Sequence, residues 1–322
     1  MSTFAVHATP DPSTVRIEGP WTHRDVYANG IRLHVAETGD GPLVLMLHGF
    51  AEFWWAWRHQ LRALGEAGFR AVAVDLRGYG DSDKPPRGYD AWTLAGDVAG
   101  LVKALGERKA HLVGHGWGGL LAWTVAAMHT RVVHSVTALA APHPLALRRE
   151  IRRTALRRRA DNQAHAAGPL FRAQLPIAPE RWLTRHDAIE IEHHFRQLAG
   201  RGWRESPEFV EAVLRYRNAM RVWGVAHSAL EYYRWAVRSQ LRGEGRRFAE
   251  ALDRRTPVPV LRIHGTDDPF MLVTTAMASS AWLGPHTSRN LLRGIGHFPH
   301  EEAPTATSRL IADFLGSGPW PP

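Results

Sequence analysis

The stretch VGHGWGG at residues 113–119 decides the fold of this chain. It follows a short apolar run that predicts a buried strand, and it opens an amphipathic stretch that predicts a helix. Glycines on both sides of a central residue permit the tight strand-to-helix turn known as a nucleophile elbow, which projects the central side chain into a site. The central residue here is Gly116, so the position that would carry a nucleophile has no side chain.

Strands and helices alternate around this stretch. Residues 23–28 and 31–38 alternate in polarity on either side of Asn29-Gly30, and this pattern predicts a hairpin with a type I′ turn. Further strands are predicted at residues 42–47, 71–74, 111–113, 132–139 and 258–263, and helices at residues 54–65, 93–105, 117–128 and 305–315. This order predicts an α/β fold with a mostly parallel sheet flanked by helices and an antiparallel edge.

The alternation stops after Pro144 and resumes at Val258. The intervening chain has a helical pattern rich in Arg, His and Trp, which is typical of a cap inserted between two strands of one sheet. We therefore predict three parts, namely a leader at residues 1–22, a core in two segments at residues 23–144 and 246–322, and a helical cap at residues 145–245. Residues 147–159 predict an amphipathic, arginine-rich helix, which we interpret as a surface helix at the cap hinge; the alternative is an anion-binding arm.

Composition limits the possible partners. The chain has 322 residues, of which 44% are apolar, and it contains no cysteine, so it forms no disulfide. Residues 1–20 do not have the pattern of a signal peptide, and no apolar run approaches the length of a membrane helix. The net charge of +9 comes almost entirely from arginine, without a nucleic-acid-binding motif. We therefore expect a cytoplasmic protein that binds neither membrane nor nucleic acid, and we make no prediction about its oligomeric state.

Three further segments complete a candidate site. His48-Gly49-Phe50 follows an apolar strand, and the backbone N–H groups of Phe50 and Trp117 are predicted to form an oxyanion hole. His297 lies on a loop near the C-terminus, where a general base can be delivered. Asp268, shortly after the strand ending at residue 263, is preferred over Asp267 as the carboxylate that orients this histidine. The chain order of elbow, acid and histidine supports this choice.

Four segments resemble soluble epoxide hydrolases, with haloalkane dehalogenases sharing much of the likeness. They are residues 48–60, 75–85, 230–234 and 296–304. The resemblance implies the eight-stranded α/β-hydrolase fold with a helical cap, and it implies that Tyr233 is one of two cap tyrosines that bind an epoxide oxygen. It also implies an elbow aspartate that attacks carbon and forms an ester.

The chain departs from that family pattern at two places. The elbow aspartate is replaced by Gly116, and the segment around Gln174 that should carry the second tyrosine reads Phe171, Arg172 and Ala173 instead. The covalent mechanism is therefore predicted to be absent, whereas His297 and Asp268 are kept.

These observations favour a pseudoenzyme or ligand-binding protein that takes a small, largely apolar molecule. The alternative is a hydrolase in which His297 and Asp268 activate a water that attacks an epoxide or ester directly. An engineered Asp-to-Gly change and a non-enzymatic anion-binding module are two further interpretations. Trp54 and Trp117 near the site, with Trp182 and Trp235 in the cap, suit an apolar ligand. No histidine spacing indicates a metal site and no nucleotide fingerprint is present, so no cofactor is expected.

Overall fold

The computed structural model describes residues 9–156 and 162–318, and a sheet lies at its centre. Within these residues the sheet has eight strands in the order β1-β2-β4-β3-β5-β6-β7-β8. The strands are β1 (Thr22–Ala28), β2 (Ile31–Thr38), β3 (Leu43–Leu47), β4 (Arg70–Val74), β5 (Ala110–His115), β6 (Val133–Leu139), β7 (Val260–Gly265) and β8 (Thr287–Leu292). The pairs β1–β2 and β2–β4 are antiparallel and all others are parallel, which confirms the predicted sheet and its antiparallel edge.

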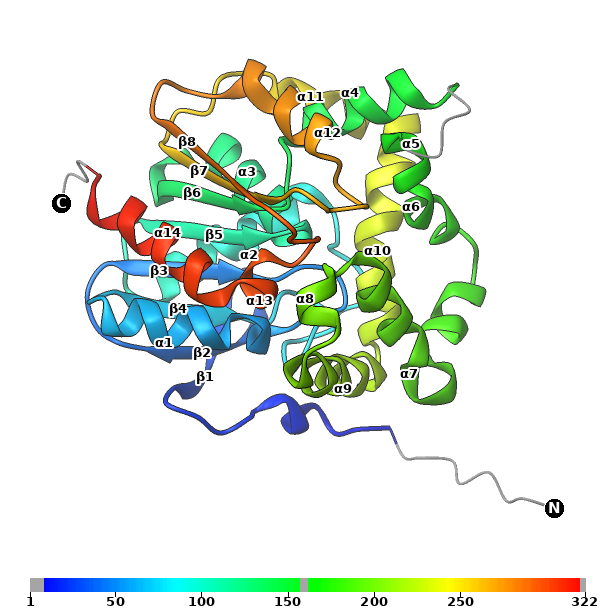
Figure 1. Cartoon of the computed structure of the whole chain (residues 1–322), viewed down its shortest axis with the longest axis horizontal. Helices are drawn as coiled ribbons and strands as arrows, with labels where there is room; N and C mark the ends of the chain where they lie inside the picture. Colours follow the sequence, from blue (N-terminus) through cyan, green and yellow to red (C-terminus); the bar gives the residue numbers. More distant parts are fainter. Residues whose placement is uncertain (1–8, 157–161, 319–322) are drawn as a thin grey trace.

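Helices cover both faces of the sheet. In Figure 1, α1 (Arg58–Glu66) and α14 (Pro304–Gly316) lie in front of the strands, and α2 (Ala91–Ala104) and α3 (Trp117–Met128) lie behind them. A 3₁₀ turn, η2 (Trp54–Trp57), precedes α1. Because both faces are covered, the central strand β3 is buried along its whole length, as its continuous apolar sequence predicts.

A helical insertion separates β6 from β7 and lies at one end of the sheet (Figure 1). It contains α4 (Pro144–Thr154), α5 (Gln163–Ala166), α6 (Gly168–Arg172), α7 (Ala178–Leu198), α8 (Arg201–Arg204), α9 (Pro207–Arg221), α10 (Val225–Arg238), η4 (Ser239–Leu241) and α11 (Gly243–Leu252). Its described residues include no strand, as expected. The helix predicted at residues 147–159 begins earlier, at Pro144, and ends at Thr154; residues 157–159 lie outside the described residues. The boundaries of the cap at 145 and 245 stay a prediction.

Close packing of α3 on the sheet depends on glycine. A β-carbon at Gly118 would stand 2.0 Å from the carbonyl oxygen of Leu47, in β3. Any larger residue would push the first turn of α3 away from β3. Glycine at position 118 therefore allows α3, and the turn at Gly116 that precedes it, to lie close to the strand.

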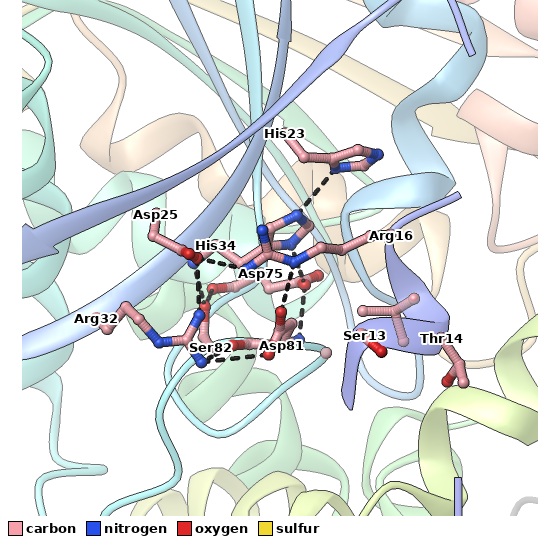
Figure 2. A network of polar contacts seen from close by, with 12 residues as sticks. Ser13, Thr14, Arg16, His23, Asp25, Arg32, His34, Asp75, Asp81 and Ser82 are labelled. Carbon is pink, nitrogen blue, oxygen red and sulfur yellow. Dashed lines mark hydrogen bonds and ion pairs between the residues drawn. The ribbon is translucent and has the colours of Figure 1, made fainter. Parts of the chain in front are cut away.

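The N-terminal segment packs against the core. The side chain of Arg16 reaches Asp25 and Asp81, each at 2.6 Å (Figure 2). The indole nitrogen of Trp54 donates to the carbonyl of Val15, which belongs to the short turn η1 (Pro12–Val15). Residues 9–21 of the predicted leader are therefore held in place by ion pairs and a buried hydrogen bond. Among all described residues, no helix is long and apolar enough to span a membrane.

Candidate active site

Gly116 occupies a sharp turn between β5 and α3. Its backbone has φ 50° and ψ −114°, in the left-handed region that favours glycine. Its N–H donates to the carbonyl of Leu139 and its carbonyl accepts from the N–H of Leu120, both at 3.0 Å. A β-carbon built at this position would have His297 Nε2 at 3.6 Å and Gly49 Cα at 3.8 Å as its nearest neighbours. The side-chain position at 116 is therefore open and faces His297.

His297 is held by Asp268. The Nδ1 atom of His297 lies 2.8 Å from Oδ2 of Asp268, while Oδ1 accepts from the backbone N–H groups of Phe270 and Met271. Burial alone would raise the pKa of Asp268, but His297 and the amides lower it below its usual value, so the carboxylate is charged. With Nδ1 committed to Asp268, Nε2 of His297 is the nitrogen that faces Gly116. The neighbouring Asp267 is exposed and contacts Thr266 instead.

The backbone amides of Phe50 and Trp117 are free to bind a ligand. Both residues line the cavity beside Gly116. Neither amide N–H donates to an acceptor in the part of the chain that the structure describes. Two unpaired donors next to an elbow are what an oxyanion hole requires, although that role stays a prediction.

A cavity of about 550 Å³ opens beside Gly116 and is walled mainly by aromatic and aliphatic side chains. The ring of Tyr233 stacks on Phe50 with centroids 4.7 Å apart, and Trp117 lies 5.4 Å away. Burial raises the pKa of Tyr233, although a hydrogen bond from Trp117 opposes the shift, so its phenol stays neutral. A volume of this size suits a small molecule, since ligand sites are commonly about 300–1,000 Å³.

His194, on α7, also lines the cavity, although no local sequence pattern indicates this position. Its ring lies 5.4 Å from that of Phe50. Burial, with a smaller contribution from the nearby His297, lowers the pKa of His194 to about 4. It is therefore a neutral polar group at neutral pH. Its neighbour His193 is exposed and contacts Glu190, so the two histidines point to different surroundings and only His194 lines the cavity.

The sequence of this chain is similar to those of proteins from one known family. Residues 42–304 match the family described as the alpha/beta hydrolase fold. The chain belongs to the α/β-hydrolase family. It is 32% identical over 302 residues to an AB hydrolase superfamily protein, YfhM, of Bacillus subtilis, covering 90% of this chain and 96% of that protein. It is also 33% identical to epoxide hydrolase 3 of Xenopus tropicalis, covering 89% and 75% of the two chains.

Solved structures of epoxide hydrolases are also similar to this α/β hydrolase. The crystal structure of epoxide hydrolase VrEH1 from Vigna radiata superimposes with a TM-score of 0.76 at 28% identity, covering 93% of this chain and 99% of that one. An epoxide hydrolase from an endophytic Streptomyces matches with the same TM-score and identity, covering 96% of that chain. The α/β hydrolase described here is therefore epoxide-hydrolase-like in sequence and in fold.

A buried polar network supports the turn of this α/β hydrolase from below. Glu52 Oε2 lies 2.8 Å from His115 Nδ1, and Glu52 Oε1 lies 3.1 Å from His300 Nε2. The other ring nitrogen of His115 is 2.8 Å from the carbonyl oxygen of His297. Both nitrogens of His115 face acceptors, which requires both to carry protons. Although burial opposes it, Glu52 raises the pKa of His115, and the pair is charged.

The three side chains also have the residue types of a metal site, since their ligand atoms all lie within 4.8 Å of one another. Their hydrogen bonds explain the cluster without an ion, because Glu52 Oε2 additionally accepts from the N–H of Gly49 at 2.6 Å. We interpret the cluster as a support that fixes His115, the residue before Gly116. Sequence reasoning missed it because its members come from three distant segments.

One predicted site residue lies elsewhere. Trp54 was expected to contact a ligand, but the structure buries it in η2 against Trp21 and His23 and does not place it among the residues that line the cavity. The reason is the hydrogen bond from its indole to Val15, which directs the ring toward the N-terminal segment. In the cap, Trp235 lines the cavity as expected, whereas Trp182 does not and is partly exposed.

Proposed function

We propose that this epoxide-hydrolase-like α/β hydrolase binds a small, largely apolar molecule and cannot form a covalent ester with it. The observation that carries this proposal is the open position at Gly116, which faces His297 and has no side chain to attack with. An attacking group would have to come from another residue. Among the described residues that line the cavity there is no carboxylate, serine or cysteine, and the hydroxyl of the one lining threonine, Thr124, donates to the carbonyl of Leu120. Asp268 is buried behind His297 and is committed to it.

A second function is favoured by one observation, the hydrogen bond of 2.8 Å between His297 and Asp268. A water beside Gly116 could lose a proton to His297 Nε2 while its oxygen attacks a substrate carbon. In an epoxide the carbon–oxygen bond would break, and the new alkoxide would recover a proton from His297. The amides of Phe50 and Trp117 and the phenol of Tyr233 would stabilise the developing negative charge. No covalent intermediate with the protein forms on this route.

A single assay separates the two functions. The unmodified protein and a His297→Ala variant are compared for hydrolysis of small esters and epoxides, with near-ultraviolet circular dichroism to show that both are folded. Equal rates reject the water mechanism and support a binding protein. A loss of rate in the variant supports the water mechanism instead. Mass spectrometry of the protein during incubation with an epoxide should detect no added mass, and an alkyl ester on the chain would overturn both functions.

A further inference from the structure

Two arginines line the largely apolar cavity at a part formed by α4 and η4. Arg148 and Arg152 lie one helical turn apart on α4, and both are among the lining residues. An Nη atom of Arg148 donates to the carbonyl of Gly245 at 3.0 Å, but its Nε atom is buried and has no hydrogen-bond partner among residues 9–156 and 162–318. A buried N–H without an acceptor is uncommon in proteins, so this guanidinium keeps hydrogen-bonding capacity that the described residues do not use.

No carboxylate of the described residues neutralises this pair. Within the described residues, neither Arg148 nor Arg152 forms an ion pair, although Glu150 lies between them in the sequence. Glu150 is bound to Arg153 at 2.6 Å. Burial and the nearby charge of Arg152 lower the pKa of Arg148, as expected where two cations lie close together without a counter-ion. An anion placed between the two guanidinium groups would reduce their mutual repulsion and could accept hydrogen bonds from both.

An apolar surface connects Gly116 to these arginines. Trp117, the residue after Gly116, packs in one cluster with Leu120, Leu147 and Ile151. Leu147 and Ile151 each precede one of the two arginines on α4 and line the same cavity. A molecule that extends from the turn along this cluster therefore reaches charged groups only at its far end.

We propose that the cavity takes an amphiphile with an apolar body along Trp117, Leu120 and Leu147 and a carboxylate held by Arg148 and Arg152. This inference rests on the proposed ligand-binding function and names the ligand class. The planar guanidinium suits a carboxylate, since two N–H groups can bind its two oxygens. Gln240 lies in the same cavity, and its unpaired amide oxygen can accept from a water that accompanies the carboxylate.

The test uses the full chain with two probes of equal length, dodecanoate and dodecan-1-ol, at pH 8. Binding is followed by tryptophan fluorescence, because Trp117 and Trp235 line the cavity. Dodecanoate should bind about ten-fold more tightly than the alcohol, the ratio expected from one added charge-assisted contact. Arg148→Gln and Arg152→Gln should each remove most of this preference, by weakening the binding of dodecanoate more than that of the alcohol.

Arg149→Gln is the matched control, since Arg149 lies on the same helix and is exposed like Arg152 but does not line the cavity. It should leave both affinities unchanged. Arg152→Gln keeps the test valid if Arg148→Gln fails to fold, because the Arg152 side chain forms no hydrogen bond or ion pair with the described residues. Equal affinities for acid and alcohol, or an equal loss in Arg149→Gln, would overturn the carboxylate site while the ligand-binding function stands. Binding of neither probe would overturn both.

Discussion

His297 faces Gly116 across open space, with its Nε2 atom 3.6 Å from the point where a β-carbon at position 116 would stand. Its other ring nitrogen is fixed by Asp268 at 2.8 Å. The imidazole is thus oriented as it would be for a general base, but the residue that it faces offers only hydrogen. This relationship makes position 116 the most informative place to change.

Gly116→Asp should introduce slow epoxide hydrolysis through an ester on the new carboxylate. A side chain fits, because the nearest atoms to its β-carbon are at ordinary contact distance. The rate should stay low since Tyr233 has no tyrosine partner around residue 173. The free energy of unfolding should fall by about 1–3 kcal/mol, the usual cost of a non-glycine residue in such a backbone conformation. Diol formation from styrene oxide and urea unfolding measure the two effects.

Gly116→Asn is the control for this change, because it has the same shape and backbone cost but no nucleophilic oxygen of comparable strength. It should be as destabilised as Gly116→Asp and show no gain in hydrolysis. A folded Gly116→Asp protein that forms neither diol nor ester would mean that the cavity has diverged from that of an epoxide hydrolase as well.

Asp268→Asn should destabilise the protein at neutral pH whether or not it is an enzyme. The carboxylate accepts from His297, Phe270 and Met271, and hydrogen bonds to a charged group are worth about 1.5–3 kcal/mol. Because the pKa of Asp268 is held below its usual 3.8, its contribution is present above that pH and is lost as pH falls through the folded pKa. Urea unfolding should show a large difference in the free energy of unfolding between the two proteins at pH 7 and a smaller difference at pH 3. A difference independent of pH would contradict this account.

Local sequence patterns predict most of the helices and strands. The differences at β8 and η2 depend on the surroundings of these segments in the folded protein. The turn at Gly116 was predictable because glycine spacing acts within a few residues. The edge strand β8 (Thr287–Leu292) was not placed, because its exposed face is polar and it has no continuous apolar run. The amphipathic pattern from residue 54 predicts a helix, but its first four residues form the 3₁₀ turn η2, whose tryptophans are all buried.

Some residues of the candidate site are likewise predictable from the sequence, and others are not. Asp268 and His297 were placed together by chain order alone, and the structure brings them into contact. His194 could not be identified, because its position beside the cavity depends on how α7 packs over the core. Trp54 was placed near the ligand by its sequence neighbours, but a hydrogen bond to Val15 directs its ring elsewhere.

Glu52→Gln should cost most stability in a defined pH window. Burial is unfavourable for both partners, yet each raises the charged population of the other, so the pKa of Glu52 is well below 4.5 and that of His115 is above 6.5. The contribution of Glu52 is present above pH 4.5 and lost on acidification. The contribution of His115 is present below pH 6.5 and lost as pH rises through its folded pKa. The loss should therefore be greatest between these values, at about 3–5 kcal/mol for a broken buried pair.

Glu150→Gln provides the comparison for this loss. Glu150 pairs with Arg153, whose side chain is 48% exposed, and such pairs contribute about 0–1 kcal/mol. Urea unfolding of both variants from pH 4 to pH 9 should give a maximum only for Glu52→Gln. A flat profile, or equal losses in the two variants, would mean that Glu52 and His115 are not charged together.

His143→Asn should make the protein less sensitive to acid. The ring of His143 stacks on Trp282 at 4.9 Å, and its Nδ1 accepts from the N–H of Leu145 at the start of α4, so only the neutral form suits the site. Burial lowers the pKa of His143 to about 3. An unfolded chain binds a proton here below about pH 6.5, so the neutral histidine stabilises the fold above that pH and this stability is lost as pH falls.

Asparagine keeps an acceptor for the N–H of Leu145 but does not titrate. The variant should be less stable at pH 7.5 because the stack on Trp282 is lost. Between pH 6 and pH 4 the gap should close by about 1.4 kcal/mol per pH unit, the slope for one proton. His286→Asn, at an exposed histidine, should leave the slope of unfolding free energy against pH unchanged. If the His143→Asn and unmodified curves run parallel over this range, His143 already binds its proton in the folded state and the buried neutral ring is excluded.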